Sequence, residues 1–148
     1  MGKKVRKVFI DRGFGFPVRL LNVPMVKVRG MWTPKVDYDE LAKRVLLALC
    51  EKPARLTGQE IRFTRQQFGM TLQAFAKRFN VSHVAVMKWE GAGSRSTSMN
   101  WATEKDIRLF LLSRVHKAFD AVGALYCQLE EERTVEQCPV EIRMARAA

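Results

Sequence analysis

Cysteine and histidine are scarce in this sequence, and their spacing argues against a metal site. The cysteines Cys50, Cys127 and Cys138 are far apart and form no CxxC pair, and the two histidines, His83 and His116, are also distant from each other. A structural zinc site needs closely spaced thiolate or imidazole ligands. We therefore expect no metal and no cofactor. Since Cys50 and Cys127 lie on apolar helical faces, we expect buried thiols there.

Long apolar runs are also missing. No stretch approaches the roughly 18 apolar residues of a membrane-spanning helix, and no apolar signal-peptide segment follows the first residues. We expect no membrane partner and a location in the reducing cytoplasm.

A catalytic set is missing as well. The histidines have no nearby nucleophile or metal ligand, and Ser94, Ser96 and Ser98 lie in a loop without a general base. The acids of residues 37–40 crowd a helix start, where negative charge favours the helix dipole. The sequence contains no glycine-rich phosphate loop. We expect no enzyme activity.

Acidic residues are outnumbered, which points to a polyanionic partner. The 148 residues include 26 Lys or Arg and 15 Asp or Glu, for a net charge of +11. Residues 1–30 hold eight basic residues and one acid, residues 58–95 hold six and two, and residues 104–148 hold seven and eight. The positive charge therefore lies in the N-terminal segment and the central stretch, while the C-terminal third is nearly neutral.

The central stretch from residue 57 begins with a clear helix start. Thr57 is followed three residues later by Glu60, a capping box in which each side chain can bind a free backbone N–H of the other. A helix is predicted over residues 58–67. Gly69 accepts the left-handed conformation that closes many helices, so we expect the helix to end there.

Two more short helices are predicted after it. Thr71 can cap a helix over residues 72–79, with its apolar residues at helical spacing. Asn80 tolerates the positive φ of a tight turn, and Ser82 can cap a helix over residues 83–90. A helix, a short turn and a second helix form the geometry that places the second helix in the major groove of duplex DNA.

The segment TLQAFAKRFNVSHVAVMKWEG resembles the helix-turn-helix of the phage-repressor family (Cro-like, XRE). The positions that match the family pattern are Thr71, Phe75, Ala76, Val81, Ser82, Val86, Trp89 and Glu90. The chain departs from the pattern at Leu72, where the family has Gln, and at Asn80, where it has Gly. The resemblance implies a partly buried ion pair between Arg65 and Glu90.

Register with that family predicts the DNA contacts. The third helix should present its N-terminal residues to base edges. His83 could donate to a purine acceptor, Val84 could pack on a thymine methyl, and Lys88 could reach guanine or a phosphate. The full expected set is Thr71, Gln73, Ser82, His83, Val84, Met87, Lys88, Ser94 and Arg95. A plain helix cap at Thr71 and a solvated loop at the serines remain open alternatives.

The N-terminal segment alternates enough to predict a small sheet. We expect short strands at residues 5–10, 16–21 and 25–28, with turns at 11–15 and 22–24. A further turn is expected at Met31–Pro34, and a helix capped by Asp37 should cover residues 36–51.

Within this segment, DRGFGFPVRL resembles the RNA-binding motif of cold-shock domains. The resemblance implies base stacking by Phe14 and Phe16, with Arg12 on a phosphate. Pro17 interrupts the strand, and about 30 residues are too few for the five strands of such a barrel. The alternative is a glycine-containing hairpin with packed aromatic rings.

The C-terminal third predicts a long helix from Glu104 to about Glu132, capped by Thr103. Its apolar residues recur at heptad spacing, which is typical of a helix that packs against a second copy. The expected dimer interface consists of Leu111, Val115, Phe119, Val122, Tyr126 and Leu129. One further strand is predicted at Val140–Met144.

Together these features predict an α+β fold, mainly α. A small unit with β-strands at residues 1–52 should precede a five-helix-type helix-turn-helix domain with a long C-terminal helical region, at residues 53–148. The layout, with Leu56-Thr57-Gly58 and Glu60-Ile61-Arg62-Phe63, resembles antitoxins of the MqsA or HigA type without their zinc-binding cysteines. The resemblance implies a homodimeric repressor that binds a palindromic operator of its own operon and neutralises a toxin protein. The alternatives are a phage or mobile-element regulator without a toxin, and a single-stranded RNA-binding protein that uses the GFGF segment.

Overall fold

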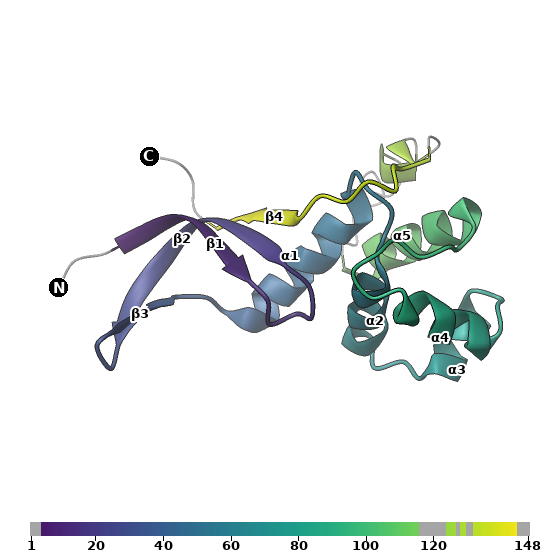
Figure 1. The fold of residues 1–148 in the computed structure, drawn as a ribbon, viewed down its shortest axis with the longest axis horizontal. Helices are drawn as coiled ribbons and strands as arrows, with labels where there is room; N and C mark the ends of the chain where they lie inside the picture. Colours follow the sequence, from purple (N-terminus) through teal and green to yellow (C-terminus); the bar gives the residue numbers. More distant parts are fainter. Residues whose placement is uncertain (1–3, 116–123, 127, 130–131, 145–148) are drawn as a thin grey trace.

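The structure of this chain mixes a small sheet with a group of helices. The computed structural model describes residues 4–115, 124–126, 128–129 and 132–144. In chain order the elements are β1 (Lys4–Asp11), β2 (Val18–Val28), β3 (Met31–Pro34), α1 (Tyr38–Glu51), α2 (Gly58–Gln67), α3 (Leu72–Arg78), α4 (His83–Gly91), α5 (Trp101–Val115) and β4 (Val140–Arg143). The sheet lies at one end of the molecule, α2 to α5 lie at the other, and α1 runs between them (Figure 1). The mixed class agrees with the expected α+β fold.

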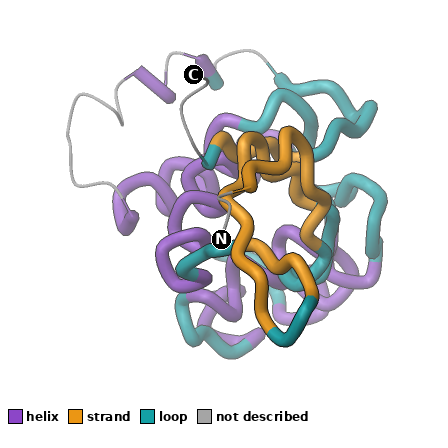
Figure 2. The backbone as a smooth tube through the Cα atoms, turned by 90° about the vertical axis from the view of Figure 1, so that its left-hand side faces the viewer, coloured by secondary structure: helices purple, strands orange, loops and turns teal. Residues whose placement is uncertain are grey.

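Strand β2 is the centre of the sheet. It pairs with β1 and β3 in antiparallel directions and with β4 in parallel. Because β4 lies near the C-terminus, the sheet contains residues from both sides of the boundary that the sequence predicted near residue 52. Figure 2 shows the strands together, with the helices around them. The strand expected at Val140–Met144 is confirmed over Val140–Arg143.

Two turns expected in the N-terminal segment are wrong. Strand β2 continues through residues 22–24, and Met31–Pro34 is a strand, not a turn. Asn22 has a φ of 56°, and buried residues lie at even positions before it and at odd positions after it. A local left-handed residue, which Asn tolerates, thus keeps both halves of β2 facing the core. The actual turn is Arg29-Gly30, with φ values of 50° and 80°, which suits a two-residue hairpin.

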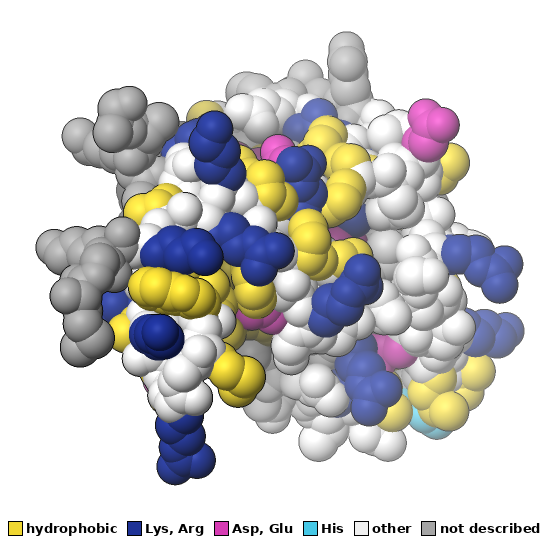
Figure 3. Space-filling view, turned by 60° about the vertical axis from the view of Figure 1, so that its left-hand side comes forward, with side chains coloured by type: hydrophobic (Ala, Val, Ile, Leu, Met, Phe, Trp, Pro, Cys, Tyr) yellow, Lys and Arg dark blue, Asp and Glu magenta, His cyan; other side chains and the backbone are white. Residues whose placement is uncertain are grey.

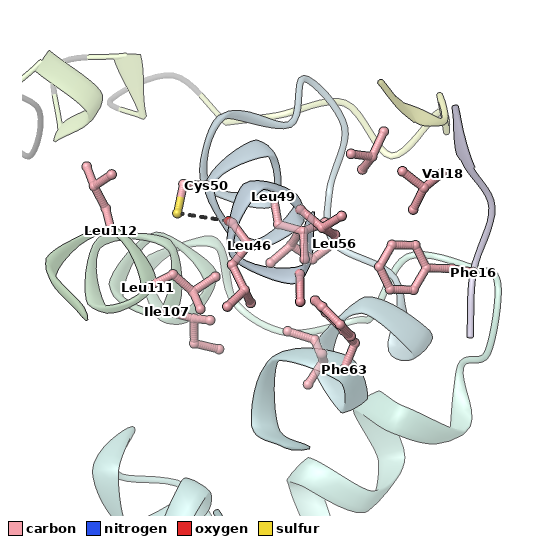
Figure 4. Packing of buried hydrophobic residues seen from close by; sticks show 14 of the residues in the cluster. Phe16, Val18, Leu46, Leu49, Cys50, Leu56, Phe63, Ile107, Leu111 and Leu112 are labelled. Carbon is pink, nitrogen blue, oxygen red and sulfur yellow. Dashed lines mark hydrogen bonds between the residues drawn. The ribbon is translucent and has the colours of Figure 1, made fainter. Parts of the chain in front are cut away.

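Helix α1 joins the sheet to the other helices through one continuous core. The Asp37 carboxylate accepts hydrogen bonds from the backbone N–H groups of Asp39 and Glu40, so the predicted cap is confirmed. Buried side chains from β2, α1, α2 and α5 belong to a single cluster, which includes Val18, Leu49, Phe63 and Leu111 (Figure 4). The sheet therefore has no separate core among the described residues.

A buried charged network holds the segment after α1. Lys52 donates from Nζ to both carboxylate oxygens of Glu60, at 2.8 and 2.9 Å, although its side chain is only 3% exposed. Arg55 donates from Nε to Glu104 at 2.9 Å, and Arg108 donates to the same carboxylate. These contacts tie the segment to α2 and α5. These contacts were not predicted from the sequence, because Lys and Arg are rarely buried.

The C-terminal helical region differs from the expected long helix. Helix α5 begins at Trp101, three residues earlier than predicted, and Asn100 accepts a hydrogen bond from the N–H of Ala102 at 2.8 Å. Leu111 and Leu129 have 0% exposure, because the chain's own core covers them. They therefore offer no surface to a second copy. Val115 is half-buried and Tyr126 is 48% exposed, while Phe119 and Val122 lie outside the described residues.

Candidate nucleic-acid interface

Helices α3 and α4 begin at the caps that the sequence predicted. The Thr71 hydroxyl accepts from the N–H of Ala74 at 3.0 Å, and the Ser82 hydroxyl accepts from the N–H of Ala85 at 3.1 Å. Between the two helices, Asn80 has a φ of 57°. The capping box of Thr57 and Glu60 is also present at the start of α2. These local predictions are confirmed.

One face of this helix pair is buried, which fixes the direction of the other face. Phe75 and Ala76 of α3 and Val86 and Trp89 of α4 are all buried in the core. The rings of Phe75 and Phe79 lie 4.8 Å apart, centre to centre. Because Val86 and Trp89 point inward, the intervening positions of α4 point to solvent.

An ion pair holds α4 against α2. Arg65 donates from Nε and Nη2 to the two carboxylate oxygens of Glu90, at 2.7 and 2.9 Å, and from Nη1 to the carbonyl oxygen of Met70 at 3.0 Å. The hydrogen bond to Glu90 raises the pKa of Arg65, against the opposing effect of burial. The side chains are 15% and 12% exposed, so the predicted partly buried pair is confirmed. A bidentate pair sets both the distance and the angle between the two helices.

A close backbone contact also fixes the C-terminal end of α4. A Cβ atom at Gly58 would collide with the carbonyl oxygen of Trp89 and would lie 2.8 Å from both Glu90 O and Gly93 N. The N–H of Gly58 donates to the carbonyl oxygen of Arg95 at 3.2 Å. The loop after α4 therefore lies against the start of α2. This role of Gly58 was not predicted from the sequence, because it depends on a backbone contact with residues more than thirty positions away.

The predicted contact residues are all exposed. Val84 and Met87 of α4 are 47% and 53% exposed, which is unusual for apolar side chains beside a buried core. The other exposed members are Thr71, Gln73, Ser82, His83, Lys88, Ser94 and Arg95. They come from the start of α3, from α4 and from the loop after it. Within the described part of the chain, Lys88 and Arg95 have no carboxylate partner, so both charges are available to an anion.

This arrangement offers three kinds of contact to a duplex. The imidazole of His83 and the ammonium of Lys88 can donate to base acceptors, and Val84 and Met87 can pack against a thymine methyl group. The backbone and hydroxyl groups at the start of α3 can bind phosphate. Because the inward face of α4 is fixed, this outward set is held as one rigid surface.

The aromatic rings of the GFGF segment pack against a ring on α2. Phe16 is 4% exposed, and the rings of Phe14 and Phe16 lie 5.5 and 5.4 Å from the ring of Phe63 on α2. A base could stack on Phe16 only if the ring left this cluster. The geometry favours the hairpin with packed aromatics over the RNA-binding alternative. Arg12, in the same turn, is exposed.

The cysteine expectation is confirmed for Cys50. Its thiol is fully buried and donates to the carbonyl oxygen of Leu46 at 3.3 Å (Figure 4). Burial raises its pKa to about 12. Cys127 lies outside the described residues. Across the described residues, no group of three or more His, Cys, Asp or Glu side chains is arranged to hold a metal ion. None of the described helices has the length and hydrophobicity needed to cross a membrane.

Comparison with known proteins adds no further constraint. The chain matches no family model, no curated protein sequence and no solved structure. The similarity to repressors therefore rests on the residues of the central stretch.

Proposed function

We propose that this chain binds duplex DNA in a sequence-specific manner through α4 and represses transcription. One observation carries the proposal. The outward face of α4 presents His83, Val84, Met87 and Lys88 to solvent, while the bidentate pair of Arg65 and Glu90 holds the inward face. A rigid exposed helix that follows a capped helix and a tight turn suits insertion in a major groove.

The mechanism divides the contacts into two groups. Base selection comes from His83, Val84 and Lys88 along the groove. Thr71, Gln73 and the loop after α4 bind phosphates and set the position on the duplex. The net charge of +11 supplies attraction that does not depend on the sequence and that weakens as salt rises.

Repression at a palindrome needs two copies of the chain. Two α4 helices would meet half-sites roughly 34 Å apart, one turn of B-DNA. Leu111 and Leu129 are buried within one chain, so the dimer contact must use other residues, of which Tyr126 is an exposed member of the predicted seam. Sedimentation with and without operator DNA measures whether two copies bind.

A direct test is fluorescence anisotropy with the DNA upstream of the chain's own gene. A scrambled duplex and a single-stranded RNA of equal length serve as competitors, and the salt concentration is varied. We expect tight binding to one duplex and a two-fold symmetric footprint. Equal affinity for the scrambled duplex would refute sequence-specific repression, and preference for the RNA would move the binding surface away from α4.

The narrower role of antitoxin is a proposal that rests on the resemblance alone. It requires a stable complex with the toxin encoded beside the chain's gene. Co-expression of the two neighbouring gene products, followed by size-exclusion chromatography, tests it. Separate elution together with DNA binding would instead favour a regulator without a toxin.

A further inference from the structure

The sheet has one face that no described element covers. Helix α1 and β2 share the buried cluster on one side, where Val18, Leu20, Val23 and Met25 point. Directly paired residues of neighbouring strands point to the same side of a sheet. The residues that pair with the intervening positions of β2 therefore share the opposite side, which we call the outer face.

Aliphatic side chains line the outer face. On β1, Val5 pairs with Pro24 and Val8 pairs with Leu21. On β3, Met31 pairs with Val28. The exposed aliphatic members of the outer face are Val5, Val8, Ile10, Val26, Val28 and Met31, with exposures from 39% to 71%. An antiparallel sheet that keeps one face in water normally has polar side chains there. A contiguous apolar patch of this kind marks an interaction site.

The three-stranded region is positively charged, although Lys4, Arg6 and Lys27 lie on the side opposite the outer face, because they pair with Met25, Val23 and Trp32. Lys35, whose backbone N–H donates to Pro24, borders the outer face. The exposed basic residues of the three-stranded region are Lys4, Arg6, Lys7, Arg12, Lys27, Arg29 and Lys35. Asp11 is the acid of this region, and it is 6% exposed, with its carboxylate bound to the N–H of Gly13 and the hydroxyl of Tyr38. Among the described residues of this region, Arg19 forms an ion pair, with Glu141 of β4. Figure 3 shows Lys and Arg side chains interleaved with hydrophobic ones on this side of the molecule.

We propose that the outer face is a docking surface for a second protein whose own contact surface is apolar and rimmed with Asp or Glu. Aliphatic residues supply the contact area, and the surrounding cations select an acidic rim. A second copy of this chain would bring two cationic rims together, which costs free energy. Single-stranded nucleic acid needs flat rings for stacking, but Trp32 pairs with Lys27 and so lies on the opposite side.

The proposal does not depend on DNA binding, because the outer face contains none of the α3 and α4 residues.

A library of random 12-residue peptides displayed on phage is selected against the full-length chain. The bait for counter-selection carries Val8→Thr, Val26→Thr and Val28→Thr. Thr keeps the β-branched shape, so strand preference is retained while the apolar surface is lost. The control bait carries Val135→Thr, since Val135 is 65% exposed outside the sheet.

We expect selected peptides to combine hydrophobic residues with Asp or Glu. Synthetic copies should bind the triple-Thr chain at least about tenfold more weakly and the Val135→Thr chain equally well. Charge reversal at Arg29, next to Val28, and at Lys35, whose N–H donates to Pro24, should also weaken binding, whereas Lys43→Glu on α1 should not. Circular dichroism melting checks that each variant is folded, and operator binding is measured on the same samples.

Several results would overturn the proposal. One is the absence of enriched peptides, and another is enrichment of peptides without acidic residues. Equal affinity for the triple-Thr chain would place the contact elsewhere. Preferred binding to vesicles of phosphatidylglycerol would make the outer face a lipid-binding surface. Self-association that the Thr substitutions abolish would make the occupant a second copy. If the wild-type chain does not bind operator DNA, the repressor proposal is refuted, but the proposal of a docking surface is not affected.

Discussion

Arg108 and Glu104 lie one turn apart on α5, and both side chains are completely buried. Arg108 donates from Nε and Nη2 to Glu104 Oε2, at 3.1 and 2.9 Å. It also donates to the carbonyl oxygens of Cys50, Lys52 and Ala54. These contacts use all five donors of the guanidinium group. Burial lowers the pKa of Arg108, and the Glu104 carboxylate opposes that effect. The Arg108 side chain thus binds the free carbonyl oxygens at the C-terminus of α1 and holds the segment that leads to α2 in place.

Replacing Arg108 should destabilise the whole fold. In Arg108→Leu, the Glu104 carboxylate keeps Arg55 but loses the other of its two cations, and three buried carbonyl oxygens lose a donor. We expect a loss of about 3–5 kcal/mol in the free energy of unfolding, measured by urea titration. Arg108→Lys should lose less, because an ammonium keeps the charge but not the planar set of donors.

Arg114 provides the matched control for Arg108. It lies on the same helix but is exposed, so Arg114→Leu should change the free energy of unfolding by no more than about 0.5 kcal/mol. Equal losses in the two variants would show that the buried network has no special role in stability.

A methyl group at Gly58 should disturb the contact between α2 and α4. The added Cβ would collide with the backbone of residues 89–93, which cannot move as a flexible side chain does. We expect Gly58→Ala to lower the free energy of unfolding by about 1–3 kcal/mol, within the range for overpacked sites.

Gly91 makes the control for Gly58, because a Cβ there would meet nothing within 4 Å. It lies within α4, where Ala is a better helix former, so Gly91→Ala should raise stability by up to about 1 kcal/mol. Thermal melting of both variants measures the difference. A stable Gly58→Ala chain would contradict the close packing of the two helices.

The sequence predicted the helix starts of the candidate site because capping is a local interaction. Thr57, Thr71 and Ser82 each bind an N–H within three residues, so a short pattern is enough to find them. The course of β2 was missed, because the left-handed Asn22 looks like a turn residue in sequence but sits inside a strand here.

Contacts between residues far apart in the chain were the hardest features to predict from the sequence. Heptad spacing marks Leu111 and Leu129 as one apolar stripe, but spacing cannot tell whether the chain's own core or a second copy covers it. The burial of Lys52 and Arg108 was not predicted, because only the folded chain brings Glu60 to Lys52 and the carbonyl oxygens of residues 50–54 to Arg108.

The thiol of Cys50 should resist modification in the folded chain. Its unfolded-state pKa of 9.0 rises to about 12 on folding, because burial disfavours the thiolate. The stability from this group is therefore complete below pH 9 and is lost as the pH rises toward 12. Iodoacetamide at pH 8, followed by peptide mass spectrometry, should label half-buried Cys138 first and Cys50 only after unfolding. Equal labelling rates at the two sites in the native chain would contradict the burial of Cys50.

Lys88 offers the sharpest test of the proposed DNA contact. It is exposed on α4 without a carboxylate partner among the described residues, so removing its side chain should not affect the fold. If it binds a base, Lys88→Ala should weaken operator binding by about 1–3 kcal/mol and leave random duplex less affected. If it binds a phosphate, both affinities should fall equally, and the salt dependence should decrease by about one counterion. Lys43→Ala on α1 removes the same charge far from α4 and controls for net charge. Anisotropy titrations at several salt concentrations distinguish the two contacts, and identical binding by the Lys88 and Lys43 variants would remove Lys88 from the interface.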